Sequence, residues 1–361
     1  MRFPEFSGEW KKCIIQDYGE VVTGNTPPTN NAEYYNNGSY LWASPADLGI
    51  NKNVTDTKTK LSLSGFKKTR NVPKGSVLVT CIGSTIGKMG MATETMSSNQ
   101  QINSVVVNDK NNSDFVYYAI CRAFPRYLSE VGVQAVPILS KSNFEKLPNY
   151  TTSRDEQNKI GYFLSLLDER IATQNKIIDK LQSLIKGLAV ALTTKGKPNI
   201  AISQCLECHS STLQESEVLP NGLYKVFGAN GLVGYTDVPQ MSSDAILVIK
   251  DGSGVGTVSY AQGKFSVIGT LNYLTAIGNI DLRYLYFALS VFNFQPYKTG
   301  MAIPHIYFKD YGKAKIYCPP LAEQKHVANV LGKLESKLFV EQGLLASFNQ
   351  QKQYLLGQMF I

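Results

Sequence analysis

Two segments of the chain carry one pattern, SVLVTCIGSTIGKMGM at residues 76–91 and AILVIKDGSGVGTVSY at residues 245–260. Each is a short apolar run, a loop rich in glycine and serine, and a second short run. Apolar or alternating runs of four to eight residues that end at Gly and Ser are typical of β-strands. The pattern therefore predicts a strand, a tight turn and a second strand, formed twice along the chain.

A second pair of segments repeats in the same order. VGVQAVPILSKSNFEKLPNYTTSRDEQNKI at residues 131–160 aligns with KTGMAIPHIYFKDYGKAKIYCPPLAEQKHV at residues 298–327. The alignment places Pro137 on Pro304, and it places the pair Glu156-Gln157 on Glu323-Gln324. Two matches in one order and at nearly one spacing indicate an internal duplication.

Each Glu-Gln pair precedes a segment in which apolar residues recur at intervals of four and three. This is the a/d heptad pattern of a coiled coil. Gln174 and Glu341 hold equivalent positions near the middle of each stripe, where a buried polar pair can fix the register. An alternative is two amphipathic helices that pack only on their own domains. The predicted seam residues are Ile160, Leu164, Leu167, Ile171, Gln174, Ile178, Leu181, Ile185, Leu188, Leu331, Leu334, Leu338, Glu341, Leu345, Phe348 and Leu355.

The duplication predicts an α+β fold with two tandem strand-rich domains, each followed by a long helix. We expect the two helices to pair as an antiparallel coiled coil with pseudo-two-fold symmetry. A short helix is expected within 114–131 and again within 280–294. The predicted boundaries are 1–153 for the first domain, 154–195 for its helix, 196–200 for a linker, 201–320 for the second domain and 321–361 for its helix.

Composition indicates a packed, mildly basic protein. The chain has 361 residues, 43% of them hydrophobic, and a formal net charge of +8. It has no apolar run near the ~18 residues of a membrane span, and its first residues do not resemble a signal peptide. We therefore expect a cytoplasmic location. A basic charge favours polyanion partners, but residues 200–320 carry equal numbers of basic and acidic side chains.

Several segments resemble motifs for catalysis or metal binding, but the residues or elements that such motifs need around them are missing. The loop at 251–256 has the glycines of a nucleotide-binding loop, but a strand-like segment follows it where such a loop needs a helix. Neither Pro-Pro pair fits the Asn- or Asp-Pro-Pro-aromatic motif of DNA amino-methyltransferases. Cys205, Cys208 and His209 spell C-x-x-C-H, without the further ligands of a zinc site nearby. We expect no catalytic residue, no metal site and no cofactor bound by this chain.

The chain resembles the specificity subunits of type I restriction–modification systems over nearly its whole length. PEFSGEWKKCIIQDYGEVVTGNTPP (4–28) and EYYNNGSYLWASPADLG (33–49) resemble the opening of one target-recognition domain. LYKVFGANGLVGYTD (223–237) resembles another common class of such domains. Both halves then carry the strand–Gly-Ser–strand element and a Pro-Leu-x-x-Gln-like approach to the helix, which is clear at residues 319–324.

The resemblance implies a non-catalytic subunit that binds double-stranded DNA. It implies two methyltransferase subunits as partners, with motor-nuclease subunits in the restriction complex. S-adenosylmethionine, ATP and Mg are then expected on those partners. Each recognition domain reads one half of a split target, and the helices separate the domains and dock the methyltransferases. Because the first ~60 residues of the two halves differ, we expect a bipartite, asymmetric target rather than a palindrome.

Reading should use side chains that hydrogen-bond to base edges and phosphates. The candidates are Lys58, Lys60, Lys67, Lys68, Arg70, Lys74, Ser84, Thr85, Lys88, Gln134 and Lys141 in the first domain, and Ser253, Thr257, Lys298, Thr299, His305 and Lys309 in the second. Three alternatives stay open at this stage. They are a specificity module of a type IIB-like restriction enzyme or methyltransferase adaptor, a coiled-coil scaffold with two domains that bind ligands other than DNA, and an enzyme with an unrecognised site.

Overall fold

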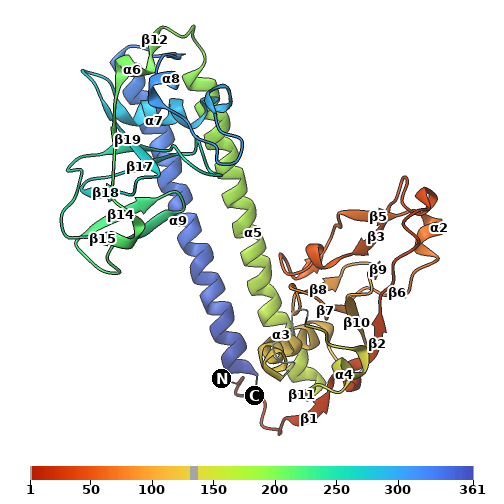
Figure 1. Cartoon of the computed structure of the whole chain (residues 1–361). Helices are drawn as coiled ribbons and strands as arrows, with labels where there is room; N and C mark the ends of the chain where they lie inside the picture. Colours follow the sequence, from red (N-terminus) through yellow and green to blue (C-terminus); the bar gives the residue numbers. More distant parts are fainter. Residues whose placement is uncertain (1, 131–136, 361) are drawn as a thin grey trace. The chain divides into compact units, whose positions relative to one another are not determined.

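The computed structural model describes residues 2–130 and 137–360. Its contacts divide the chain into two units. Unit 1 comprises Met1–Lys176 and Gly343–Ile361, and unit 2 comprises Ile177–Gln342. Two long helices, α5 (Arg154–Thr193) and α9 (Leu321–Met359), each contribute residues to both units (Figure 1). No helix among the described residues is long and apolar enough to cross a membrane.

Unit 1 is built mainly from short strands. The strands are β1 (Lys11–Ile14), β2 (Gly19–Thr23), β3 (Tyr40–Ala43), β4 (Asn53–Val54), β5 (Thr59–Leu61), β6 (Asn71–Val72), β7 (Val77–Thr80), β8 (Met89–Ala92), β9 (Met96–Ser98), β10 (Ile102–Val107) and β11 (Pro148–Thr151). The short helices are α1 (Ile15–Tyr18), η1 (Ala32–Tyr34), η2 (Pro45–Asp47), α2 (Leu63–Phe66), α3 (Ser113–Glu130) and α4 (Lys141–Glu145). The strands form a proximal sheet of order β2-β10-β7-β8-β4, a distal sheet of order β5-β3-β9-β6, and the pair β1-β11.

Unit 2 repeats this plan with fewer strands. The strands are β12 (Ile200–Ala201), β13 (Leu206–Ser210), β14 (Tyr224–Gly228), β15 (Gly231–Thr236), β16 (Ala245–Ile249), β17 (Val258–Ala261), β18 (Phe265–Val267), β19 (Leu271–Ala276) and β20 (Lys315–Ile316). The short helices are α6 (Ile202–Cys205), η3 (Glu215–Glu217), α7 (Leu282–Ser290), η4 (Gln295–Tyr297) and α8 (Phe308–Tyr311). The sheets have the orders β13-β19-β16-β17, β15-β14-β18 and β12-β20.

The duplication is confirmed in the strand topology. The order β13-β19-β16-β17 in unit 2 repeats β2-β10-β7-β8 in unit 1. The predicted short helices are α3 and α7. Each unit also contains a parallel pair that involves the strand after the Gly-Ser hairpin, β3 with β9 and β14 with β18. The openings of the two domains differ in sequence, yet each one supplies a strand to this pair.

The proximal sheet of each unit is buried on both faces, because successive side chains of a strand point to opposite sides. In unit 1, Val79 of β7 shares a core with Tyr118 of α3 and Leu164 of α5, whereas Leu78 packs with Leu41 of the distal sheet. The same division recurs on β16 of unit 2, where one face packs on α7 and the other packs against β18. Each unit is therefore a helix layer, a proximal sheet and a smaller second sheet.

Residues of α5 and α9 contact each other inside each unit. In unit 1, Lys352 of α9 lies 2.6 Å from Asp168 of α5, and Leu355 shares a core with Leu164. In unit 2, Ala189 of α5 shares a core with Leu331 of α9, and Lys195, just beyond α5, forms an ion pair with Glu323. All sixteen predicted seam residues are buried or half-buried. A coiled coil along the full length of both helices stays a prediction.

The glutamine of each Glu-Gln pair makes buried hydrogen bonds, which explain why it occurs at the start of each long helix. The buried side-chain amide of Gln157 accepts a hydrogen bond from the Asn112 backbone N–H (2.9 Å) and donates one to the Thr152 carbonyl (2.9 Å). In unit 2, Gln324 accepts from the Asp281 N–H (2.9 Å) and donates to the Pro319 carbonyl (2.7 Å). Each glutamine thus joins the start of a long helix to the residue just before α3 or α7.

We predict that Gln157→Met and Gln324→Met each lower the free energy of unfolding by about 1–3 kcal/mol, because buried backbone groups lose their partners. Hydrogen exchange is the measurement. The amide of Asn112 should lose protection only in Gln157→Met, and the amide of Asp281 only in Gln324→Met.

Gln182→Met is the matched control, because this residue is exposed on α5. It should leave both amides protected. Loss of protection in both units from one variant would contradict the assignment of one glutamine to each unit.

Candidate nucleic-acid interface

The Gly-Ser loop of unit 1 closes the antiparallel pair of β7 and β8. Gly83 and Gly87 have φ of 94° and 89°, a region that suits glycine. A Cβ on Gly87 would also lie 2.9 Å from the Phe124 ring of α3. The loop is therefore held in one conformation against α3, with Ser84 and Lys88 exposed on its outer side.

The corresponding loop of unit 2 has the same construction. It joins the antiparallel strands β16 and β17, with φ of 96° at Gly252 and 86° at Gly256. A Cβ on Gly256 would lie 2.9 Å from Cβ of Phe294. Both loops lead into a strand, so the prediction of strand-to-strand turns is confirmed. Ser253 and Thr257 are exposed on the loop of unit 2.

A second segment is hydrogen-bonded to each Gly-Ser loop. In unit 1, Gly83 N–H donates to the Pro137 carbonyl (3.0 Å) and Leu139 N–H to the Cys81 carbonyl (2.8 Å). In unit 2, Gly252 N–H donates to the Pro304 carbonyl (2.9 Å). These bonds bring two regions of the sequence together in each unit. They place exposed Lys141, at the start of α4, shortly after the unit 1 contact.

The second segment of unit 2 is a closed loop. Thr299 and His305 exchange backbone hydrogen bonds of 2.9 and 2.8 Å, and the loop follows half-buried Lys298. Lys309 is exposed and lies 5.2 Å from the centre of the Tyr307 ring. Five of the six predicted residues of unit 2 thus lie on or beside two loops in contact, and Lys309 lies four residues beyond the second loop.

The basic cluster predicted in the first domain lies elsewhere in unit 1. Lys58 and Lys60 lie at β5, Lys67 and Lys68 follow α2, and Arg70 precedes β6. These five therefore belong to the distal sheet, whereas Lys74 lies between β6 and β7. Lys60 pairs with Asp56 at 2.8 Å, and the Arg70 guanidinium donates to the Thr23 carbonyl at 3.0 Å.

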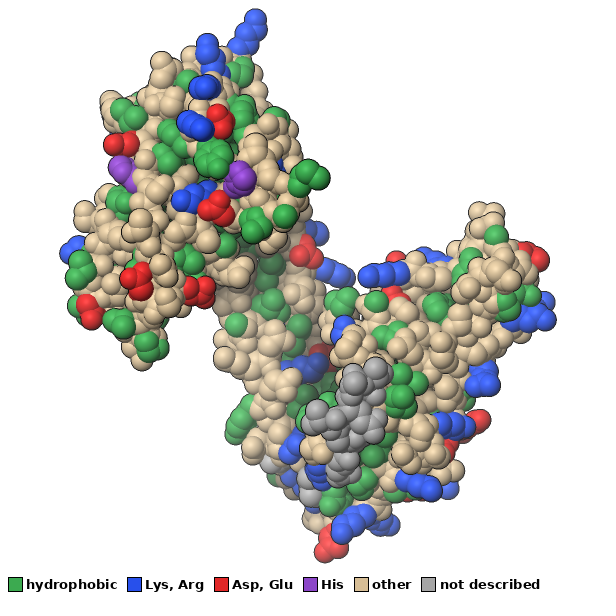
Figure 2. Space-filling model, in the orientation of Figure 1, with side chains coloured by type: hydrophobic (Ala, Val, Ile, Leu, Met, Phe, Trp, Pro, Cys, Tyr) green, Lys and Arg blue, Asp and Glu red, His purple; other side chains and the backbone are tan. Residues whose placement is uncertain are grey.

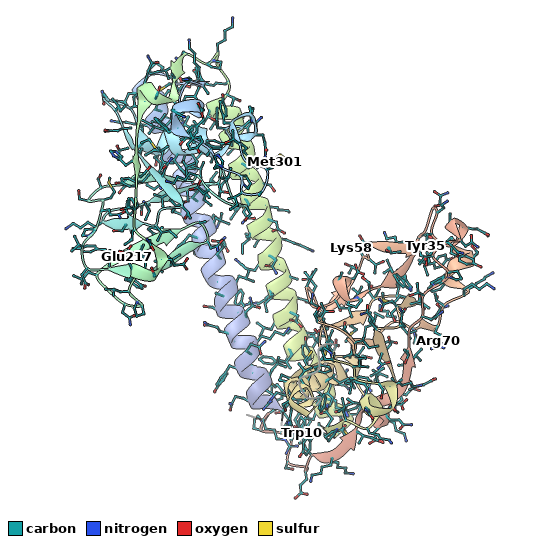
Figure 3. The ribbon with its side chains drawn as sticks, in the orientation of Figure 1. Trp10, Tyr35, Lys58, Arg70, Glu217 and Met301 are labelled. Atoms are coloured by element: carbon teal, nitrogen blue, oxygen red, sulfur yellow. The ribbon has the colours of Figure 1, made fainter. Side chains whose placement is uncertain are left out.

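Unit 1 therefore has two groups of candidates, one at the Gly-Ser loop and one on the distal sheet. Figure 2 shows basic side chains spread along the outer margin of this unit rather than gathered into one patch. Figure 3 labels Lys58 and Arg70 on the distal sheet. Gln134 lies outside the described residues. Unit 1 thus presents several separate hydrogen-bond donors.

The sequence analysis missed the apolar side chains of the unit 2 loop. Met301 is fully exposed, at 106% relative accessibility, and Ile303 is 67% exposed (Figure 3 labels Met301). They are apolar, so the polar and basic candidates predicted from the sequence do not include them. The signal that was available is the run Gly300-Met301-Ala302-Ile303-Pro304, which is apolar but too short for a buried strand.

The two cysteines of the C-x-x-C-H motif pack in the unit 2 core. Burial raises the pKa of Cys205 to about 12, with a further contribution from Cys318, and burial raises that of Cys208 to about 11. His209 stacks on Tyr273 with ring centres 5.1 Å apart. Among the described residues, no group of three or more His, Cys, Asp or Glu side chains is placed to hold a metal ion.

Several known proteins are similar to this chain. The specificity subunit of the HindI enzyme of Haemophilus influenzae is 26% identical over 186 residues, which are 49% of this chain and 40% of that protein. The MjaIX specificity subunit of Methanocaldococcus jannaschii is 30% identical over 188 residues, which are 48% and 42%. The EcoprrI specificity subunit of Escherichia coli is 20% identical over 344 residues, which are 87% and 84%. The chain thus spans about two fifths of the length of the first two relatives.

The fold is also found in solved structures. A crystal structure of the S subunit of a type I restriction–modification system from M. genitalium matches with a TM-score of 0.71 and 19% identity, over 98% of this chain and 96% of that one. A chain from a study of the assembly of the type I system matches with a TM-score of 0.54 and 13% identity, over 97% of both chains.

The family described as "Type I restriction modification DNA specificity domain" matches residues 7–183 and again residues 206–350. Each match begins in one strand-rich unit and extends along the long helix that follows it. The chain therefore belongs to the type I restriction modification DNA specificity family, and it carries that domain twice.

Proposed function

We propose that this chain is the DNA-specificity subunit of a type I restriction–modification complex. One observation carries the proposal: the two units share a frame of proximal sheet, Gly-Ser loop and buried glutamine, but they fill it with different loops and different distal sheets. A shared frame would give two partner subunits equivalent docking sites. Different loops suit two different half-sites in one split DNA target.

The candidates for contact with DNA differ between the units. The loop of unit 1 offers Ser84, Thr85 and Lys88, and that of unit 2 offers Ser253 and Thr257. Hydroxyls and amines of this kind bind phosphates and base edges, and base edges in the major groove distinguish the four base pairs. The two units then read different sequences, and the target is bipartite and asymmetric.

The long helices supply the spacing between half-sites. Helices of 40 and 39 residues are each about 60 Å long at 1.5 Å per residue. One turn of B-DNA is ~34–36 Å. Helices paired as an antiparallel coiled coil would hold the two units over separate stretches of the same duplex.

The proposal assigns catalysis to partner subunits. Two methyltransferase subunits would bind this chain and bring S-adenosylmethionine. Motor-nuclease subunits would bring ATP and Mg to the restriction complex. The chain itself would supply no catalytic group and bind no cofactor. Such a complex would act on chromosomal DNA in the cytoplasm.

The experiment is co-expression with the methyltransferase subunit of the same restriction–modification system, followed by mapping of methylated bases across a genome. The expected result is one bipartite, asymmetric motif with a fixed gap, which disappears when either chain is omitted. Methylation without this chain, or at a palindromic motif, would contradict the proposal.

A coiled-coil scaffold that binds ligands other than DNA remains a second candidate, because residues 200–320 have no net charge. Salt dependence separates the two. Binding through phosphates weakens steeply as salt rises, with a slope set by the number of phosphates neutralised. A complex without salt-sensitive binding to duplex DNA would favour the scaffold.

Removing one heptad from each helix should shorten the gap in the target. Deleting residues 175–181 and 338–344 keeps the seven-residue repeat and shortens each helix by about 10 Å, which is about three base pairs. Methylation mapping should give the same half-sites with a shorter gap. Replacing the two heptads by others of equal length is the control and should leave the gap unchanged. An unaltered gap after deletion would rule out the helices as the spacer.

Variants of the two Gly-Ser loops should affect different half-sites. Replacing Ser253 and Thr257 by Ala removes two hydroxyls from unit 2, which should relax one or two base pairs of one half-site by about 1–3 kcal/mol each. Replacing Ser84 and Thr85 by Ala should relax the other half-site. Methylation mapping reads both halves in one measurement. Relaxation of both halves by a single variant would contradict the assignment of one unit to each half-site.

A further inference from the structure

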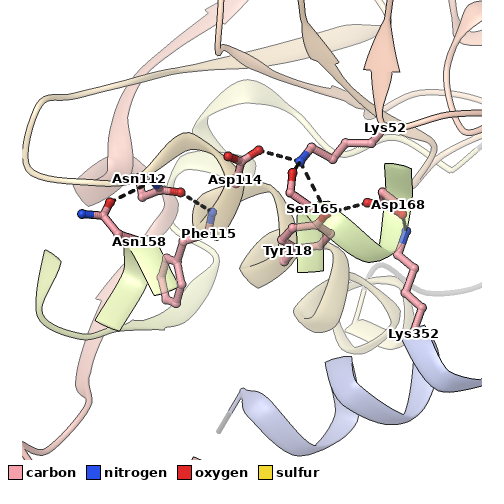
Figure 4. A network of polar contacts seen from close by, with 9 residues as sticks. All are labelled: Lys52, Asn112, Asp114, Phe115, Tyr118, Asn158, Ser165, Asp168 and Lys352. Carbon is pink, nitrogen blue, oxygen red and sulfur yellow. Dashed lines mark hydrogen bonds and ion pairs between the residues drawn. The ribbon is translucent and has the colours of Figure 1, made fainter. Parts of the chain in front are cut away.

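Unit 1 contains a buried lysine, Lys52, which does not contribute to the basic surface of the domain. Lys52 lies in the segment before β4, and its side chain is only 4% exposed. Its Nζ lies 2.5 Å from Asp114 Oδ1 and 3.4 Å from the Tyr118 hydroxyl, and it donates a hydrogen bond to Ser165 Oγ (Figure 4). Because lysine is rarely buried unless it is paired, these contacts define the position of this side chain closely.

The contacts continue to both long helices. Asp168 of α5 accepts a hydrogen bond from the Tyr118 hydroxyl (2.5 Å). It also forms an ion pair with Lys352 of α9 (2.6 Å). We call Lys52, Asp114, Tyr118, Ser165, Asp168 and Lys352 the Lys52 brace. Its two lysines and two aspartates balance in charge, so the brace is complete without a bound ion. It joins the edge of the proximal sheet to α3, α5 and α9.

The segment that carries Lys52 is fixed to the sheet on its other side. The Lys52 carbonyl accepts a hydrogen bond from Met91 N–H (2.7 Å), and Gly49 N–H donates to the Met89 carbonyl (3.0 Å). Directly after Lys52, β4 pairs in parallel with β8. A movement of Lys52 against α5 is therefore a movement of the whole sheet edge against α5.

A cavity of about 260 Å³ lies beside the brace. Ile50, Asn51 and Asn53 of the sheet edge line it together with Glu169 of α5 and Asn349 of α9. Side chains do not fill the space between the sheet edge and the helices here. The contacts of Lys52 with Asp114 and Ser165 span this region, so they hold the sheet edge at its distance from α5.

Unit 2 joins the equivalent elements in another way. Tyr286 of α7 donates to Glu335 of α9 (2.7 Å), as Tyr118 does to Asp168. The cation is Arg283, which comes from α7 itself and stacks over Tyr260 of β17 at 4.5 Å. Within the described residues, β17 is the edge strand of its sheet and has no counterpart of β4 beyond it. An ion pair from a buried lysine at the sheet edge is thus a feature of the first domain.

We propose that Lys52 is a positioning residue that fixes the angle at which the first recognition domain is held on α5, and thereby the gap between half-sites that the complex accepts. The inference rests on the proposed function. Apolar contacts between the sheet, α3 and α5 hold the domain in place without fixing a direction. An ion pair with a buried lysine requires a defined geometry, and the best-attested use of buried polar groups is to select one arrangement among several. A small rotation at the brace is enlarged at the distal sheet, where Lys58 and Arg70 lie.

The test measures gap selection in the complex with its methyltransferase subunits. The substrates are plasmids that carry the mapped target with its natural gap, or with the gap one base pair shorter or longer. Lys52→Met keeps the length of the side chain and removes its charge. We expect the preference for the natural gap to fall by at least about tenfold, while the bases required in each half-site stay the same. Lys52→Arg should restore part of the preference.

Lys110→Met is the matched control, because it removes the charge of an exposed lysine in the same domain. It should leave gap selection unchanged. If Lys52→Met lowers methylation equally at all three gaps, or leaves gap selection intact, the positioning role is wrong. If the wild-type complex recognises no bipartite target, the proposed function itself fails, and that outcome is distinct from a wild-type gap preference that Lys52→Met does not alter.

Discussion

Each half of this protein depends on one buried side-chain amide. A helix begins with backbone N–H groups that have no hydrogen-bond partner inside the helix. The chain that leaves a neighbouring strand likewise has carbonyl groups without a partner in the sheet. Gln157 and Gln324 are each buried and satisfy groups of both kinds at once. The amide suits this task because it has both an acceptor and two donors. A carboxylate would lack the donors, and an apolar residue would leave both partners unsatisfied. This bond ties the first turn of each long helix to the residue just before α3 or α7.

The sequence predicted the parts of the fold that depend on local pattern. Short apolar runs around glycine and serine predicted β7–β8 and β16–β17, and the four-three spacing predicted α5 and α9. The predicted seam is buried or half-buried because the period of its apolar residues follows the helix period. Glycines at 83, 87, 252 and 256 mark the turns because each has a positive φ.

Other features have no local signal. The Lys52 brace joins residues 52, 114, 118, 165, 168 and 352, and nothing in their spacing predicts that they meet. Lys52 lies close in sequence to the basic cluster that begins at Lys58, yet it is buried and Lys58 is exposed. The charge pattern of the sequence does not distinguish the buried lysine from the exposed one. The candidate DNA contacts of the distal sheet and of the Gly-Ser loop also belong to different surfaces of unit 1, which the sequence analysis could not show.

The parallel strand pairs explain how the two domain openings can differ in sequence while the proximal sheet, the buried glutamine and the long helix stay the same. In each unit the strand after the Gly-Ser hairpin, β9 or β18, accepts one parallel partner, β3 or β14. The partner comes from the opening of the domain, whose sequences are unlike in the two halves. A strand that joins an existing edge has only to supply backbone hydrogen bonds and an apolar face, because register follows from that face. Segments on either side of the added strand are then free to vary. Distal loops can therefore change what they contact while the proximal sheet, the buried glutamine and the long helix keep their geometry.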